Sequence, residues 1–162
     1  MGTGHAITCK KCGTEYSIMT GIGFMFPTVY KETVDKIRSG EFGEELKELF
    51  LNDNGLAVDC EEDLFVCKCG HWKTEINLDV YEPLNEDIRK RYTNDLGNMF
   101  AMRYELKHDF KQVRHQKHIC DKCGKEMKQI KYPDSYVRRY GLSCPECGEK
   151  NTADPRGMIF WD

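Results

Sequence analysis

The sequence of 162 residues has no long apolar run. No stretch approaches the roughly 18 consecutive apolar residues that a membrane-spanning helix needs, so no membrane partner is expected. The first seven residues contain no apolar core, and no signal peptide is predicted. We therefore expect a cytoplasmic protein, whose cysteines are thiols and bind metal rather than form disulfides.

The sequence also has no recognisable catalytic or nucleotide-binding motif. Gly21-Ile-Gly23 has neither the third glycine nor the helix signal of a dinucleotide site. No His-x-Glu occurs with a Pro-Cys-x-x-Cys partner, which argues against a zinc deaminase. Cys60 has acidic neighbours on both sides, which disfavour its thiolate form and make it a poor nucleophile. An enzyme is therefore not the favoured interpretation.

Cysteine is the residue type that the chain does have in quantity. Eight of its nine cysteines form four close pairs, each followed by glycine: Cys9-Lys-Lys-Cys12-Gly13, Cys67-Lys-Cys69-Gly70, Cys120-Asp-Lys-Cys123-Gly124 and Cys144-Pro-Glu-Cys147-Gly148. Two cysteines on a short turn supply two corners of a tetrahedral metal site. The glycine suits a backbone φ that other residues adopt at a cost. Four such turns, here called knuckles, predict two sites.

Four knuckles can be joined in three ways, and we expect sequential pairing, because each knuckle then has its partner in one compact lobe. The C-terminal site would use Cys120, Cys123, Cys144 and Cys147, with 20 residues between the knuckles. The N-terminal site would use Cys9, Cys12, Cys67 and Cys69, with 54 residues between its knuckles. For this site Cys60, His71 and His5 stay open as alternatives to Cys69 as the fourth ligand.

Four cysteines close a tetrahedral site and leave no position for an activated water. We therefore predict two structural zinc ions, with iron as the alternative. Each site of four thiolates and one divalent ion adds two negative charges. The formal charge of −3 then becomes about −7, which disfavours a general nucleic-acid binder.

Short strands are predicted around the knuckles, over residues 6–8, 15–19, 64–66, 72–78, 118–119, 126–132, 142–143 and 158–161. Between the first two knuckles, helical periodicity predicts helices over residues 29–38 and 41–51, with Thr28 as an N-cap. We expect this helical hairpin to cover one face of the first lobe. A further helix is predicted over residues 85–91 with Asn85 as N-cap, and alternation over residues 104–110 predicts a strand.

The two C-terminal knuckles, with their Cys-x-x-Cys-Gly and Cys-Pro-x-Cys-Gly patterns, resemble those of the zinc-ribbon and rubredoxin-like group. The whole-chain pattern resembles small bacterial zinc-ribbon proteins. The resemblance implies a small, metal-stabilised α+β fold made of two zinc ribbons built on β-hairpin knuckles. A helical hairpin, at about residues 28–52, is inserted in the first ribbon. The domains would be residues 1–83 and 84–162. The resemblance implies a metal and a fold, and no particular function.

Charge is distributed unevenly along the chain. Residues 1–85 carry a net charge of −7, whereas residues 86–140 carry +6. The basic segment 103–139 is therefore the candidate surface for nucleic acid, with Tyr104 and Phe110 as stacking groups. The interpretation we favour is a zinc-binding interaction module that binds a protein rather than RNA or DNA. A rubredoxin-like iron electron carrier is the alternative.

Overall fold

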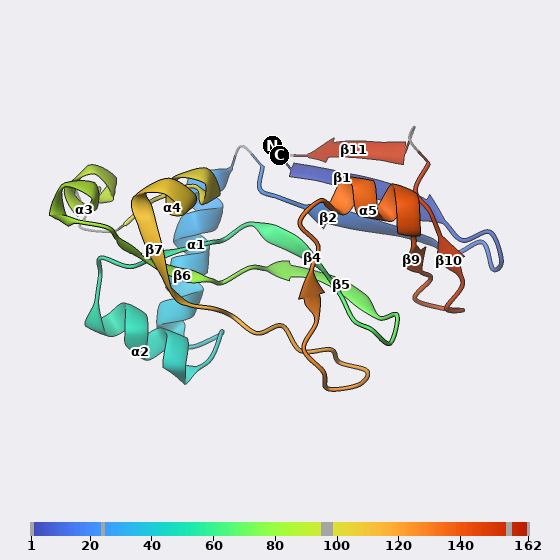
Figure 1. Ribbon diagram of the computed structural model, residues 1–162, viewed down its shortest axis with the longest axis horizontal. Helices are drawn as coiled ribbons and strands as arrows, with labels where there is room; N and C mark the ends of the chain where they lie inside the picture. Colours follow the sequence, from blue (N-terminus) through green and yellow to red (C-terminus); the bar gives the residue numbers. More distant parts are fainter. Residues whose placement is uncertain (1, 24, 95–98, 155–156, 162) are drawn as a thin grey trace. The chain divides into compact units, whose positions relative to one another are not determined.

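The computed structural model describes residues 2–23, 25–94, 99–154 and 157–161 (Figure 1). Within these residues the chain forms five helices and eleven short strands, and its strand pairs are antiparallel. The small α+β class predicted from the sequence is confirmed. None of the helices in the described ranges is both long and apolar enough to cross a membrane.

Tertiary contacts divide the chain into two compact units. Unit 1 comprises residues 1–24, 61–76 and 117–162, and unit 2 comprises residues 25–60 and 77–116. The sequence analysis placed a single boundary at residues 83 and 84, whereas each unit combines separate segments. The chain therefore leaves unit 1 and returns to it twice.

Unit 1 is built from small sheets and one helix. One sheet has the order β11-β1-β2, formed by β1 (Gly2–Thr8), β2 (Glu15–Thr20) and β11 (Met158–Trp161). The second sheet has the order β5-β4-β8, formed by β4 (Glu62–Val66), β5 (Trp72–Ile76) and β8 (Lys128–Gln129). The third is the pair β9 (Leu142–Ser143) and β10 (Lys150–Asn151), preceded by α5 (Pro133–Tyr140). The apolar core of unit 1 joins these elements through Ile7, Ile18, Leu64, Val137 and Leu142.

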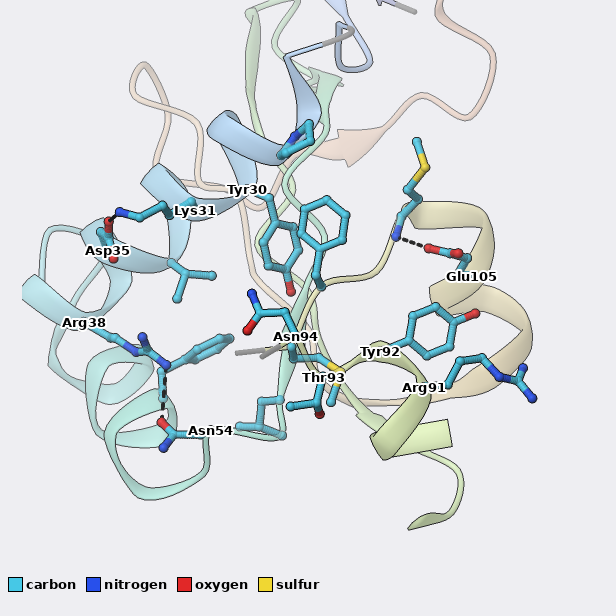
Figure 2. A pocket seen from close by; sticks show the side chains of 17 residues that line it. Tyr30, Lys31, Asp35, Arg38, Asn54, Arg91, Tyr92, Thr93, Asn94 and Glu105 are labelled. Atoms are coloured by element: carbon cyan, nitrogen blue, oxygen red, sulfur yellow. Dashed lines mark hydrogen bonds and ion pairs between the residues drawn. The ribbon is translucent and has the colours of Figure 1, made fainter. Parts of the chain in front are cut away.

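Unit 2 contains the other four helices and one sheet. The helices are α1 (Phe26–Ser39), α2 (Glu44–Asn52), α3 (Glu86–Tyr92) and α4 (Arg103–Asp109). The sheet has the order β3-β6-β7, formed by β3 (Ala57–Val58), β6 (Val80–Pro83) and β7 (Phe110–Arg114). The unit also carries a partly open cavity of about 770 Å³ (Figure 2).

Helices α1 and α2 are the predicted hairpin, and they pack against each other. The periodicity is confirmed, because Val34 and Ile37 of α1 and Leu46 of α2 are buried. The predicted N-cap at Thr28 is wrong, since α1 begins after Met25. The hairpin belongs to unit 2 together with residues 77–116.

The segment after residue 84 confirms one prediction and corrects another. Asn85 Oδ1 accepts a hydrogen bond from the Ile88 amide at 2.9 Å, so Asn85 caps α3 as predicted. Residues 104–110 were predicted as a strand, but α4 (Arg103–Asp109) takes up all of them except Phe110, which begins β7. The Met102 amide donates to Glu105 Oε2 at 2.6 Å at the start of this helix, and Leu106 is its buried residue. Local hydrogen bonding therefore prevails over the two-residue alternation.

Candidate metal centres

The four knuckles share one backbone feature, although the second is a residue shorter than the others. The glycine that follows the second cysteine has a positive φ in all four, at 76°, 89°, 68° and 75° for Gly13, Gly70, Gly124 and Gly148. In the first knuckle the Gly13 amide donates to the Cys9 carbonyl at 2.9 Å and closes the turn. Glycine adopts this left-handed conformation without the steric cost that a Cβ atom brings. The role predicted for these glycines is confirmed.

The eight paired cysteines gather into two groups of four, and either group could hold a metal ion. The outer centre contains Cys9, Cys12, Cys144 and Cys147, and the inner centre contains Cys67, Cys69, Cys120 and Cys123. The predicted sequential pairing is therefore wrong. The first knuckle joins the fourth, and the second joins the third, so the inner centre is nested within the loop that the outer centre closes.

The sulfur positions fit a tetrahedral ion. In the outer centre Cys9 Sγ lies 3.6 Å from Cys147 Sγ, and Cys12 Sγ lies 3.7 Å from Cys144 Sγ. In the inner centre the Cys67–Cys123 and Cys69–Cys120 sulfur separations are 3.4 Å and 3.7 Å. Four sulfurs at about 2.3 Å from a zinc ion would lie about 3.8 Å apart. Both groups therefore have the donors and the spacing of a four-thiolate site.

Contacts outside the cysteines bring the first and fourth knuckles together. The Lys10 amide donates to Asn151 Oδ1 at 2.9 Å, which ties the first knuckle to β10. The Tyr16 hydroxyl donates to the Leu142 carbonyl at 3.1 Å, which ties β2 to β9. These bonds join segments more than 120 residues apart in sequence. No local pattern announces such pairs, which explains why sequence reasoning missed them.

The second and third knuckles meet through a β-ladder. Strand β4 pairs with β8 through Phe65 opposite Gln129 and Val66 opposite Lys128. Strand β4 leads directly into the second knuckle, and β8 follows the third, so this ladder sets the distance between the two cysteine pairs. The Gln129 amide nitrogen also donates to Asp63 Oδ2 at 2.6 Å and fixes the register. A two-residue strand is too short to be predicted as a pairing partner from sequence.

The knuckle backbone favours thiolates. The backbone amide of Cys12, assisted by that of Lys11, lowers the pKa of the Cys9 thiol to about 6 against the opposing effect of burial. Burial raises the pKa of Cys120, but the amides of Lys122 and Cys123 outweigh it and lower the value to about 7. Both cysteines are thus prepared for metal ligation, which requires the deprotonated form.

Four thiolates in one group also repel one another. The amide of Glu149 lowers the pKa of Cys147, but burial and the sulfurs of Cys12, Cys9 and Cys144 raise it to about 12. A bound cation removes this conflict, because its charge favours the deprotonated form of every ligand. The four-sulfur arrangement is therefore the arrangement expected of a metal site.

The three alternative ligands of the first site lie outside both groups. His5 Nε2 is hydrogen-bonded to Asp134 Oδ1 at 2.7 Å. His71 Nε2 lies 3.8 Å from Asp121 Oδ2. Cys60 is buried and belongs to unit 2. Cys69, in contrast, belongs to one of the two groups that could hold a metal ion, although in a group whose other knuckle is Cys120–Cys123.

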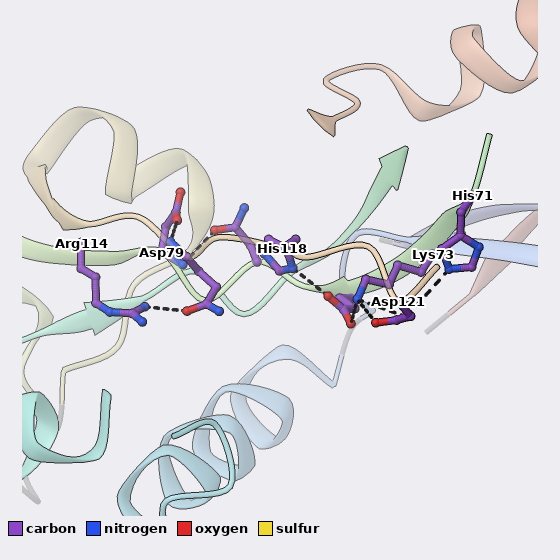
Figure 3. Close-up of polar contacts among 9 residues, drawn as sticks. His71, Lys73, Asp79, Arg114, His118 and Asp121 are labelled. Atoms are coloured by element: carbon purple, nitrogen blue, oxygen red, sulfur yellow. Dashed lines mark hydrogen bonds and ion pairs between the residues drawn. The ribbon is translucent and has the colours of Figure 1, made fainter. Parts of the chain in front are cut away.

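A polar network borders the inner centre (Figure 3). Lys73 Nζ lies 2.8 Å from Glu75 and 3.3 Å from Asp121, a residue inside the third knuckle. His118 Nδ1 is hydrogen-bonded to Glu75 Oε2 at 2.8 Å, and its ring stacks on Phe65 at 3.7 Å between centroids. His118 lies within the basic segment 103–139 that was the candidate surface for nucleic acid, but this histidine is only 6% exposed. His118 therefore packs against Phe65 just before the third knuckle begins at Cys120.

Side chains of the basic segment in unit 2 are bonded to acidic residues elsewhere in that unit. Asp79 Oδ1 is hydrogen-bonded to His115 Nδ1 at 2.9 Å and accepts from the Gln116 amide at 2.8 Å (Figure 3). Arg114 Nε lies 3.2 Å from Glu45 Oε1. Phe110, which the sequence analysis treated as a base-stacking group, is 6% exposed and lies in the core of unit 2. The structure therefore places it where a base could not stack on it.

Comparisons with known proteins assign no function, so a functional assignment depends on the geometry of the two four-cysteine centres. No protein-family model matches the sequence, and no curated protein or solved structure matches it either.

Proposed function

We propose that the protein is a zinc-binding interaction module whose two four-cysteine centres hold unit 1 together. The observation that carries the proposal is the gathering of eight cysteine sulfurs into two groups of four, with the sulfurs of each group within 4.8 Å of one another. Structural zinc sites use such a set, and they supply the folding energy that small units lack. In this proposal the two centres give unit 1 the zinc-ribbon character that its knuckles suggest.

The metal ions in this proposal are structural. With four thiolates around each ion, no coordination position is open to a water or a substrate, so neither centre has the geometry of a catalytic site. The sulfur separations of 3.4 to 3.7 Å exceed the about 2.05 Å of a disulfide bond. A set of free thiols suits a reducing compartment, which supports a cytoplasmic location.

The proposed partner surface is the exposed face of α5. Tyr132 and Tyr140 are 66% and 53% exposed, with Lys131 and Arg139 each 5.3 Å from the centroid of the neighbouring ring. Tyrosine and arginine are enriched in protein interfaces and their hot spots. A formal charge of about −7 with two metal ions bound disfavours a nucleic-acid partner, and so does the burial of Phe110. A protein partner is therefore preferred.

Metal analysis tests the centres. Protein expressed with both zinc and iron supplied should be colourless and contain two zinc ions per chain by mass spectrometry. A red protein that bleaches on reduction would support the alternative, an iron electron carrier. One observation favours that alternative for either centre: Cys12 of the outer centre and Cys69 and Cys123 of the inner centre are exposed, which would bring an iron ion close to the surface.

A second experiment tests the partner class. Capture of protein partners and retardation of RNA are compared side by side at physiological salt. The double variant Tyr132→Ser/Tyr140→Ser should lose a specific protein partner. Tyr104→Ser, at a tyrosine that is 61% exposed in unit 2, serves as the matched control. Tight, salt-sensitive RNA binding that Lys131→Glu/Arg139→Glu abolishes would overturn the preference for protein.

A further inference from the structure

Helix α5 is fixed to unit 1 by its inner side. Val137 is fully buried in the core of the unit. Asp134 Oδ1 is hydrogen-bonded to His5 Nε2 of β1 at 2.7 Å. The Gly141 amide donates to the Val137 carbonyl at 3.1 Å at the end of the helix. Side chains on the outer side of α5 are therefore presented on a rigid element, which lowers the ordering cost when a partner binds.

Three tyrosines follow the outer side of this helix. Tyr132, Tyr136 and Tyr140 recur at a spacing of four residues, which places them along one side of a helix. Tyr132 and Tyr140 are exposed, and Tyr136 is half-buried with its ring 5.2 Å from that of Tyr140 between centroids. The two exposed tyrosines are eight positions apart, which is about 12 Å along a helix. The three side chains form one aromatic row, here called the tyrosine row.

Each exposed end of the tyrosine row carries a cation beside its ring. Lys131 Nζ lies 5.3 Å from the centroid of Tyr132, and the Arg139 guanidinium lies 5.3 Å from that of Tyr140. Neither cation forms an ion pair with a described residue. A guanidinium stacked on a ring keeps its planar N–H donors for a carboxylate. The row therefore presents two positive charges that await a partner.

The carboxylate of α5 itself does not neutralise these charges. Asp134 is the one acidic residue of this helix, and it is bonded to His5 and to Arg138 Nη2 at 3.0 Å. Residues 125–140 hold five lysines or arginines against two acidic residues, a net charge of +3, in a chain whose formal charge is −3. A positive segment of a negative protein is complementary to a negatively charged partner.

We infer that the tyrosine row binds an extended acidic segment of a partner protein, with two carboxylates four residues apart, one at Lys131 and the other at Arg139. The inference rests on the proposed function, whose partner surface it specifies. In an extended chain, residues four apart lie about 13 Å apart and point to the same side. That separation matches the about 12 Å between the two ends of the row.

An acidic protein segment suits the row better than RNA does. Proteins that bind nucleic acid without sequence preference gain their affinity from many phosphate contacts, and the row offers two unpaired cations. With metal bound, the net charge of about −7 also repels a long polyanion. Two carboxylates placed at the row meet the local cations and bring little further negative charge.

The test titrates capped peptides into the complete zinc-loaded protein and follows its amide NMR spectrum. The peptide GESPSEG has its glutamates four residues apart, whereas GSEEPSG has the same composition with adjacent glutamates. GESPSEG should bind saturably, most tightly of the set, and shift amides within residues 131–140. Absence of saturable binding overturns the inference. Equal or tighter binding of GSEEPSG, of the neutral GQSPSQG or of hexauridylate also overturns it.

Single substitutions assign the binding to the two cations. Lys131→Gln and Arg139→Gln should each weaken GESPSEG on the order of threefold, the loss of one exposed charge pair. Lys90→Gln is the matched control, because Lys90 is an exposed lysine of α3 in unit 2. If Lys90→Gln weakens the peptide as much as Lys131→Gln does, the attraction is general and the assignment to the row is wrong.

Two further outcomes separate this inference from the function on which it rests. If Tyr132→Ser/Tyr140→Ser loses a captured protein partner while GESPSEG does not bind, the partner surface stands and its acidic specificity is refuted. Sedimentation without peptide should show a monomer. A dimer that Arg139→Gln dissociates would place a second copy of this chain on the row, and the inference would then be wrong.

Discussion

Units 1 and 2 are parts of the same chain, but they are stabilised in different ways. Among the described residues, unit 1 has short strands, a single helix and both four-cysteine groups, whereas unit 2 has four helices and neither group. The core of unit 2 consists of aliphatic and aromatic side chains such as Leu106 and Phe110. Small units bury too little apolar surface to be very stable. The comparison teaches that one chain can meet this limit with cysteine groups that could hold metal ions in one unit and with helix packing in the other.

The largest expected effect is that of metal removal. A chelator should unfold unit 1, because each structural zinc site supplies on the order of 10 kcal/mol of folding free energy. Both tryptophans, Trp72 and Trp161, belong to unit 1, so intrinsic tryptophan fluorescence reports on this unit alone. Hydrogen exchange in α1 and α2 should retain its protection. A native fluorescence spectrum after complete metal removal would contradict the comparison.

The nested pairing predicts a different metal count for two matched double variants. Cys12→Ser/Cys147→Ser removes two ligands of the outer centre, so one cadmium ion per chain should still bind. Cys12→Ser/Cys69→Ser removes one ligand from each centre and should weaken both. Cadmium NMR counts the ions directly. Sequential pairing predicts the reverse order, with the first variant damaging two sites and the second only one.

Core truncation should separate the units by their response to zinc. Leu64 in unit 1 and Leu106 in unit 2 are both fully buried, and changing either to alanine should cost about 2–5 kcal/mol. Excess zinc should offset the loss in Leu64→Ala, because a ligand that binds the native form stabilises it. It should not offset the loss in Leu106→Ala. Zinc-dependent recovery in both variants would show that the two units fold as one.

The smallest expected effect concerns a half-buried carboxyl in unit 1. Burial raises the pKa of Glu62 above its ordinary value, so the folded protein holds this proton more tightly than the unfolded chain. The stability contribution of the carboxyl is therefore full at low pH and is lost as the pH rises through the folded pKa. Glu62→Gln should stabilise unit 1 at pH 7 and lose this advantage in acid.

Urea unfolding followed by tryptophan fluorescence measures the difference at each pH against the unaltered protein. Glu126→Gln is the control, because Glu126 is exposed. A stabilisation by Glu62→Gln that is equal at pH 4 and pH 7 would contradict the assigned cause.

Local features were predicted well because short-range chemistry determines them. The eight paired cysteines and the positive-φ glycines could be recognised from spacing alone, and Asn85 identified the start of α3. The strand expected over residues 104–110 failed for a physical reason. In this segment the buried side chains are Leu106 and Phe110, which are four residues apart. Tyr104, which strict alternation would place on the same face, is exposed. The alternation in the sequence did not correspond to two faces of a sheet.

The sequence by itself determined that this chain contains four cysteine knuckles with the donors for two four-thiolate centres. Only the tertiary structure decided which knuckles share a centre, because β4 pairs with β8 and Lys10 bonds to Asn151 across distances in sequence that no local pattern spans. The same long-range packing buried His118 and Phe110 and opened the cavity beside α1. Ligand type is a property of the residues, whereas ligand grouping depends on how separate segments fold together.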